Sequence, residues 1–143
     1  MLGALCVQCG DAARAQVLIG QAVMLQPTNA TAHYNLGLAR EALGLLQAAL
    51  DCYDRAVELA PDQAAVYFNR GVVQQKLGRA GEAIDSYAMA VRLDPGHAQA
   101  WNNQGNLYRE NGHPQAALAC FQRALSVRPD FALAAYNAGE EAV

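Results

Sequence analysis

A period of 34 residues runs through the chain and limits its fold more than any other feature. Pro27, Pro61, Pro95 and Pro129 follow one another at this step. Two glycine series and one alanine series keep the same step: Gly3, Gly37, Gly71, Gly105 and Gly139; Gly10, Gly44, Gly78 and Gly112; and Ala15, Ala49, Ala83 and Ala117. A fixed period of this length is typical of a solenoid in which each repeat is one supersecondary unit.

Each period contains two stretches with the composition of helices. In one period these are residues 30–43 and 46–60, separated by Gly44 and followed by Pro61. Hydrophobic residues make up 53% of the chain but aromatic residues only 7%, and the abundance of alanine favours helix over strand. Glycine suits the left-handed position after a helix, and proline ends a helix because its ring removes an N–H donor. We therefore predict an all-α chain of antiparallel helix hairpins.

Gly37 lies inside the first predicted helix, where glycine costs about 1 kcal/mol relative to alanine. The closest helix packing requires small residues at the contact. We therefore predict that Gly37 meets Ala49 on the second helix. Ala56 follows Ala49 by seven residues, on the same helix face, and is predicted to pack on a neighbouring helix.

The sequence resembles a tetratricopeptide repeat array, whose signature is Trp-x2-Leu-Gly-x2-Tyr, then Ala-x3-Phe, then Pro. The best match has Gln104 at the leucine place and otherwise reads Trp101, Gly105, Tyr108, Ala117, Phe121 and Pro129. The resemblance implies a right-handed superhelical solenoid with complete units at 30–63, 64–97 and 98–131. Residues 1–29 would form a partial unit, and residues 132–143 a partial unit or capping helix. Because both ends fall within a repeat, we expect a fragment of a longer array or a domain of a larger protein.

The resemblance also implies that the first helices of successive units line a concave groove, and an asparagine ladder follows it: Asn35, Asn69, Asn103 and Asn137. An asparagine amide both donates and accepts, so it can pair with a peptide backbone of any sequence. Units about 10 Å apart would meet roughly every third residue of an extended chain, which rises about 3.3 Å per residue. We predict a peptide-binding groove in which specificity comes from neighbouring side chains: Tyr34, Leu38, Phe68, Val72, Asn102, Asn106 and Arg109.

Two other interpretations of the ladder remain open. The asparagines would fix the repeat geometry if they bonded to one another and to the backbone of the adjacent unit. The Asn-x-Gly and Pro-Asp-Phe-Ala phrases also resemble, more loosely, the repeat array of the O-linked N-acetylglucosamine transferase family, where similar ladders line the groove. That resemblance implies an array that targets substrates or partners for a larger transferase or assembly protein.

Chaperone-tail binders of this family clamp a terminal carboxylate with lysine and arginine on the inner helices. The corresponding places in this chain hold Tyr34, Leu38 and Asn69, among other uncharged residues. We therefore do not expect a carboxylate clamp.

Composition and motifs exclude several classes of function. With 10 Lys and Arg against 13 Asp and Glu, the chain lacks a basic face for nucleic acid. No apolar run approaches the roughly 20 residues of a membrane span, and four cysteines without framework spacing suggest reduced thiols in the cytoplasm. Cys6 and Cys9 have the spacing of a zinc pair but no second pair accompanies them, so buried thiols are favoured and neither metal nor cofactor is expected.

We therefore predict a non-enzymatic scaffold that binds a protein or peptide, because the sequence contains no nucleophile elbow, phosphate loop or zinc-protease motif. Self-association is another interpretation. Apolar helix faces at the two incomplete ends would stack between copies and give a homo-oligomer through terminal repeats. Glu140 and Glu141 replace apolar residues of earlier units, and a charged surface there would solvate the end of the stack.

Overall fold

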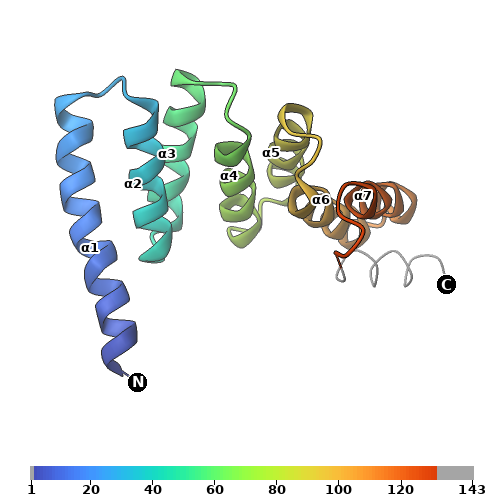
Figure 1. Cartoon of the computed structure of the whole chain (residues 1–143), viewed down its shortest axis with the longest axis horizontal. Coiled ribbons are helices and arrows are strands. Elements are labelled where there is room, and N and C mark those ends of the chain that lie inside the picture. The colour runs from blue at the N-terminus through green and yellow to red at the C-terminus, as the bar shows by residue number, and fades with distance from the viewer. Residues whose placement is uncertain (1, 132–143) are drawn as a thin grey trace.

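The computed structural model describes the backbone of residues 2–131 and the side chains of residues 10–131. Within this range the chain forms seven helices and no strands: α1 (Leu2–Leu25), α2 (Ala30–Ala42), α3 (Leu46–Leu59), α4 (Ala64–Lys76), α5 (Ala80–Leu93), α6 (Ala98–Glu110) and α7 (Pro114–Val127). The helices follow one another along the long axis, and α6 and α7 are seen more nearly end-on than α1 to α3, so the stack twists along its length (Figure 1). The predicted all-α repeat solenoid is confirmed.

Each of the three hairpins, α2–α3, α4–α5 and α6–α7, turns at a glycine with positive φ, as the sequence predicts. Gly44 has φ +77°, and its equivalents Gly78 and Gly112 have nearly the same value. The Gly44 N–H donates to the Glu41 carbonyl and the Leu45 N–H donates to the Arg40 carbonyl, both at 2.9 Å. These two bonds are a Schellman motif, which satisfies carbonyls that the end of a helix leaves unpaired.

The glycine in the middle of each first helix makes room for an aromatic ring of the second helix. A Cβ added at Gly37 would lie 2.5 Å from Tyr53 Cε1, and one added at Gly105 would lie 2.5 Å from Phe121 Cε1. Both rings are 0% exposed. The closest neighbour of Gly37 is therefore Tyr53, not the predicted Ala49, which lies one helical turn earlier in the core.

A second recurring contact ties the start of each first helix to the loop before it. His33 Nε2, Tyr67 Oη and Trp101 Nε1 each donate to the carbonyl of the proline six residues earlier, at 2.8, 3.0 and 2.9 Å. Because a carbonyl only accepts, His33 carries its proton on Nε2. Histidine, tyrosine and tryptophan share this position because all three present a donor at the end of a ring.

Neighbouring hairpins are joined by a polar cluster around Arg70 of α4. Its Nε donates to Ser86 Oγ on α5 at 3.0 Å, and its Nη1 lies 3.4 Å from Asp54 Oδ1 on α3. Ser86 is 0% exposed and donates in turn to Gln74. Every buried side-chain polar atom among the described residues has a partner, as a stable interior requires.

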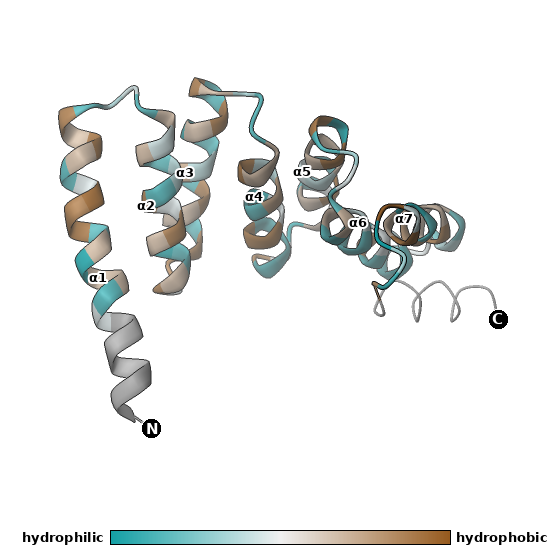
Figure 2. Ribbon diagram, viewed as in Figure 1, coloured by the Kyte–Doolittle hydropathy of each residue, from teal (hydrophilic) through white to brown (hydrophobic). Residues whose placement is uncertain are grey.

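The first helix departs from the predicted pattern. The Gly10 series predicts a turn between two helices, but α1 runs unbroken from Leu2 to Leu25, and Gly10 is not among the glycines with positive φ. Figure 2 shows hydrophobic residues along α1, and Leu18 remains 64% exposed although its equivalents Cys52, Ser86 and Cys120 are buried. The first unit is therefore one helix with an exposed apolar side rather than a hairpin.

Candidate functional site

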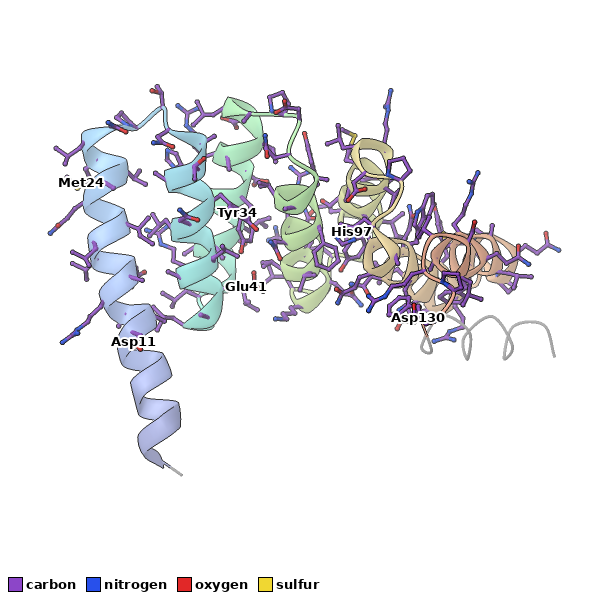
Figure 3. The ribbon with its side chains drawn as sticks, viewed as in Figure 1. Asp11, Met24, Tyr34, Glu41, His97 and Asp130 are labelled. Atoms are coloured by element: carbon purple, nitrogen blue, oxygen red, sulfur yellow. The ribbon has the colours of Figure 1, made fainter. Side chains whose placement is uncertain are left out.

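Apart from Asn102 and Asn137, the predicted groove residues lie on one side of α2, α4 and α6. Residues three, four and seven positions apart share a side of a helix, which groups Tyr34, Asn35 and Leu38 on α2. We call this surface the first-helix face and define it by Tyr34, Asn35, Leu38, Phe68, Asn69, Val72, Asn103, Asn106 and Arg109. Figure 3 shows Tyr34 and Glu41 on the side of the α2–α3 hairpin that faces α4.

Two asparagines of the ladder donate to tyrosine hydroxyls. Asn69 Nδ2 donates to Tyr34 Oη at 2.7 Å, which joins α4 to α2, and Asn103 Nδ2 donates to Tyr87 Oη at 3.4 Å. No hydrogen bond within residues 10–131 engages the amide oxygen of either residue. Asn35 is exposed. The Asn69 and Asn103 amides are thus each held at one end, and their partners are neither the neighbouring backbone nor each other.

At another position of the first helices, the side chain suits the aromatic ring that it contacts on the second helix. Glu41, Gln75 and Arg109 hold this position in the three hairpins. Tyr53 Oη donates to Glu41 Oε1 at 2.7 Å, and Tyr87 Oη donates to Gln75 Oε1 at 2.9 Å. In the third hairpin the ring is Phe121, which has no hydroxyl, and the Arg109 guanidinium lies 5.6 Å from the ring centroid. An acceptor therefore faces each tyrosine and a cation faces the phenylalanine.

Electrostatics also change along the first-helix face. Lys76 Nζ lies 3.6 Å from Glu41 Oε2, which connects α4 to α2 a second time. Arg109 donates to Asn106 Oδ1 at 3.0 Å on α6. Of the charged side chains in these contacts, Glu41 thus lies on α2, Lys76 on α4 and Arg109 on α6.

Burial raises the pKa of Tyr53 above its usual range and raises the pKa of Tyr87 to about 12, with the Glu41 charge adding to the shift in both cases. The fold therefore favours the neutral Tyr87 hydroxyl, whereas an unfolded chain ionises it near 10. This contribution to stability is fully present below pH 10 and is lost as the pH rises towards 12. In urea titrations across this range, the free energy of unfolding is expected to fall more steeply for the wild type than for Tyr87→Phe. An equal decrease with pH in both proteins would contradict the raised pKa of Tyr87.

Two family models, each described as tetratricopeptide repeat, match the sequence over residues 28–96 and 98–131. Together they span most of the chain. The protein belongs to the tetratricopeptide repeat family. A search of curated proteins finds no significant match.

Solved structures place the tetratricopeptide repeat array of this chain among known solenoids. The crystal structure of MamA is 23% identical with a TM-score of 0.88, over 92% of this chain and 77% of MamA. A MamA fragment from Desulfovibrio magneticus RS-1 is 20% identical with a TM-score of 0.85, over 95% of this chain and 77% of the fragment. The first repeat domain of Spaghetti (RPAP3), bound to the HSP90 peptide SRMEEVD, is 19% identical with a TM-score of 0.74, over 79% of this chain and 90% of that domain. At these identities the likeness concerns the fold.

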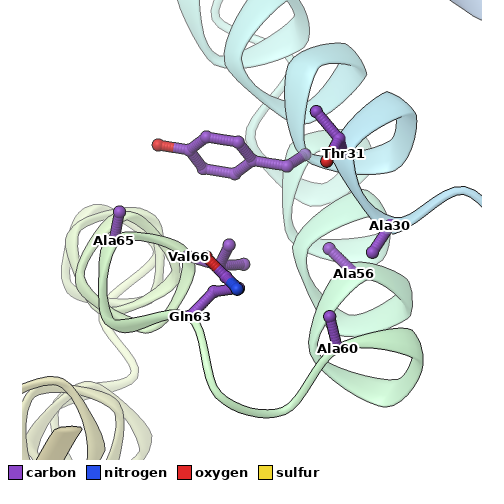
Figure 4. Close-up of a pocket in the computed structure, with 8 residues that line it drawn as sticks. Ala30, Thr31, Ala56, Ala60, Gln63, Ala65 and Val66 are labelled. Atoms are coloured by element: carbon purple, nitrogen blue, oxygen red, sulfur yellow. The ribbon is translucent and has the colours of Figure 1, made fainter.

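A pocket of about 150 Å³ opens in the tetratricopeptide repeat array where α2 and α3 meet the start of α4. Figure 4 shows Ala56 and Ala60 on α3 at one side, with Gln63 and Val66 reaching towards them from the other. The lining residues are Ala30, Thr31, Tyr34, Ala56, Ala60, Gln63, Ala65 and Val66. None carries a charge. The sequence gives no sign of this pocket, because four of its lining residues are alanines that the repeat pattern explains as packing.

Asn102 is a correction to the predicted groove. It is 1% exposed, so it lies in the interior of the tetratricopeptide repeat array rather than on its surface. Tyr34 and Phe68 hold the equivalent position and are partly buried, with their rings packed against the hydrophobic core. Asn137 of the ladder, residues 132–143 with Glu140 and Glu141, and the side chains of Cys6 and Cys9 lie outside the described residues.

The remaining cysteines are buried thiols. Cys52 Sγ accepts a hydrogen bond from Arg40 Nη1 at 3.1 Å, and burial raises the pKa of this thiol. Burial also raises the pKa of Cys120 to about 11. The part of the chain that the structure describes contains no group of three metal-ligating side chains and no helix long and apolar enough to cross a bilayer.

Proposed function

We propose that the chain is a non-enzymatic scaffold that binds an extended segment of a protein or peptide along the first-helix face. The observation that carries this proposal is the geometry of Asn69 and Asn103. Each amide is anchored through one N–H to a tyrosine hydroxyl and keeps its carbonyl oxygen available. An amide that is already oriented loses less conformational freedom when it binds, so a weak pair of hydrogen bonds contributes more to affinity.

The ligand expected on this face is an extended chain held through its backbone. The second N–H and the oxygen of an asparagine match the C=O and N–H of a peptide group, whatever the ligand sequence. Tyr34, Phe68 and Arg109 lie beside the ladder and would select the side chains. Tyr34 and Phe68 contact their own hairpins, with ring centroids 5.9 Å from Tyr53 and 5.8 Å from Tyr87, so both rings are held in place.

A targeting role within a larger transferase or assembly protein is a narrower form of this proposal. It rests on the Asn-x-Gly and Pro-Asp-Phe-Ala phrases of the sequence. In that case the same face would present the segment to an activity located elsewhere. A cytoplasmic location belongs to the same proposal and rests on the reduced, buried thiols of Cys52 and Cys120.

Self-association is a second candidate, and the exposed side of α1 favours it. Val17 and Leu18 are 59% and 64% exposed and line a recess with Gly10, Ala13 and Arg14. Apolar side chains grouped in this way are typical of surfaces that bind another protein. A second copy of this chain is the partner proposed for this surface.

Replacing Asn69 and Asn103 together with alanine is expected to weaken peptide binding about tenfold or more. Each lost hydrogen bond contributes about 0.5–1.5 kcal/mol, and every 1.4 kcal/mol is a factor of ten. The probes are peptides selected from a random library on the wild-type protein, and fluorescence anisotropy measures their affinity. The matched control replaces Gln115 and Gln122, two exposed amides of α7, with alanine and is expected to bind normally. If the Asn69 and Asn103 variant folds and binds as the wild type does, the ladder has no binding role.

A further inference from the structure

The pocket between α2, α3 and α4 differs from the corresponding place one repeat later. There Phe68 replaces Tyr34 and His97 replaces Gln63, and the two rings make a tilted contact with centroids 4.6 Å apart. His97 is also held by the start of α6, because its Nδ1 accepts from the Ala100 N–H at 3.1 Å. Gln63 makes no such cap at the start of α4. At the pocket, a glutamine thus stands where the next repeat has a histidine ring in contact with Phe68.

The lining of the pocket selects an uncharged occupant of limited size. Its inner wall is formed by Ala56 and Val66, which are 1% and 5% exposed, and Ala60 extends it along α3. A charged group would lose its hydration there without meeting an opposite charge. A volume of about 150 Å³ is close to that of an apolar cavity that accepts benzene and well below the roughly 300–1,000 Å³ of most cofactor and drug pockets. One aliphatic side chain of leucine size fits these limits.

The rim of the pocket continues the first-helix face. Thr31 lies three residues before Tyr34 and four before Asn35, so it shares their side of α2. Ala65 stands in the same relation to Phe68 and Asn69 on α4. Both rim residues are exposed. A segment bound along the ladder therefore passes the mouth of the pocket without leaving the face.

We infer that this pocket receives one aliphatic side chain of the bound segment and so sets the sequence preference of the scaffold. This inference rests on the proposed function, because it assumes that a peptide lies along the first-helix face. The asparagines bind the ligand backbone whatever the ligand sequence is. The pocket adds the sequence preference, because it accepts only certain side chains. Tyr34 serves both parts, since its hydroxyl anchors Asn69 and its ring forms a wall of the pocket.

The direct test uses N-acetyl-leucinamide as a probe and follows the methyl resonances of Ala56, Ala60 and Val66 by NMR. We expect a saturable shift of these signals with the leucine probe and none with N-acetyl-lysinamide. Gln63→His introduces the histidine found at this position in the next repeat. It is expected to weaken binding of the leucine probe at least fivefold. Gln122→His, on the exposed side of α7, is the matched control and is expected to leave the titration unchanged. Ala65→Leu gives a second variant, which narrows the exposed mouth without altering the core.

Library-selected peptides separate the pocket from the scaffold. We expect the selected peptides to share one position at which aliphatic residues are enriched. Changing that peptide residue to lysine should weaken binding to the wild-type protein at least tenfold and should have little effect on binding to the Gln63→His variant. The inference is overturned if the leucine probe gives no saturable shift, or if both pocket variants bind it as the wild type does. If the selected peptides bind through Asn69 and Asn103 but show no aliphatic preference, the proposed role of the pocket is overturned and the proposed scaffold function stands. Failure to select any peptide would overturn both.

Discussion

Replacing Phe121 with alanine is expected to lower the free energy of unfolding by about 3–5 kcal/mol, the usual cost of removing a buried aromatic side chain. The ring is 0% exposed and fills the space that Gly105 leaves on α6, and Arg109 covers it. Alanine would leave a cavity at the centre of the α6–α7 hairpin. Because a solenoid repeat contacts only its neighbours, most of the lost stability should be confined to this hairpin. Relative to the wild type, hydrogen exchange should accelerate more in α6 and α7 than in α2 and α3.

Phe121→Tyr is the control for this prediction, because Tyr53 and Tyr87 hold the same position in the other hairpins. It keeps the ring and is expected to change the free energy of unfolding by less than about 1 kcal/mol. Urea titrations followed by circular dichroism measure both variants. A loss below about 1 kcal/mol for Phe121→Ala would show that the ring does not hold the hairpin together.

The sequence predicts the hairpins because their determinants are local and repeated. The turn at Gly44 needs one residue that adopts a positive φ, and glycine supplies it at the same place in every period. The core of each hairpin follows from the same repetition, since Ala49, Ala83 and Ala117 are all 0% exposed. The repeats of this chain can thus be aligned with one another, and they give the information that usually comes from an alignment of homologous proteins.

The first helix does not follow the repeated pattern. Glycine permits a turn but does not enforce one, and a helix can continue through it at a cost of about 1 kcal/mol. In α2–α3 the turn is supported by the packing of Tyr53 on Gly37, whereas Ile19 holds the tyrosine position in the first unit. Without the ring, a turn at Gly10 lacks this support. Which of the two arrangements forms is therefore decided by packing and not by the turn residue.

The candidate site was only partly predictable, because a repeat position fixes the side of a helix but not the contact partner. Asn35, Asn69 and Asn103 share one position and have different surroundings, as one is exposed and two bond to tyrosines on different helices. The pocket beside Tyr34 is lined by Gln63 where the next repeat has His97, and the pocket itself is visible only in three dimensions.

Replacing Gly71 with valine is expected to lower the free energy of unfolding by roughly 3 kcal/mol, at the upper end of the usual cost of overpacking a core. A Cβ at this position would lie 2.7 Å from Tyr87 Cε1, and two more ring atoms lie within about 3.1 Å. The ring has little freedom to move, because it is 0% exposed and its hydroxyl bonds to Gln75 and Asn103. Gly81→Val is the matched control. Gly81 lies in α5 with no atom within 4 Å of its added Cβ, so this change is expected to stay within about 0.5 kcal/mol.

The cause of the Gly71 effect can be isolated by repeating the substitution in a Tyr87→Leu background. Leucine lacks the ring atoms that the new side chain would meet, so the cost of Gly71→Val should fall by at least about 1 kcal/mol there, a coupling typical of residues in direct contact. An unchanged cost in that background would place the strain elsewhere in α4. It would also mean that the recurring glycine serves the helix itself and not the aromatic ring of its hairpin, and Gly37 and Gly105 would then need the same reinterpretation, since their added Cβ atoms meet Tyr53 and Phe121 at similar distances.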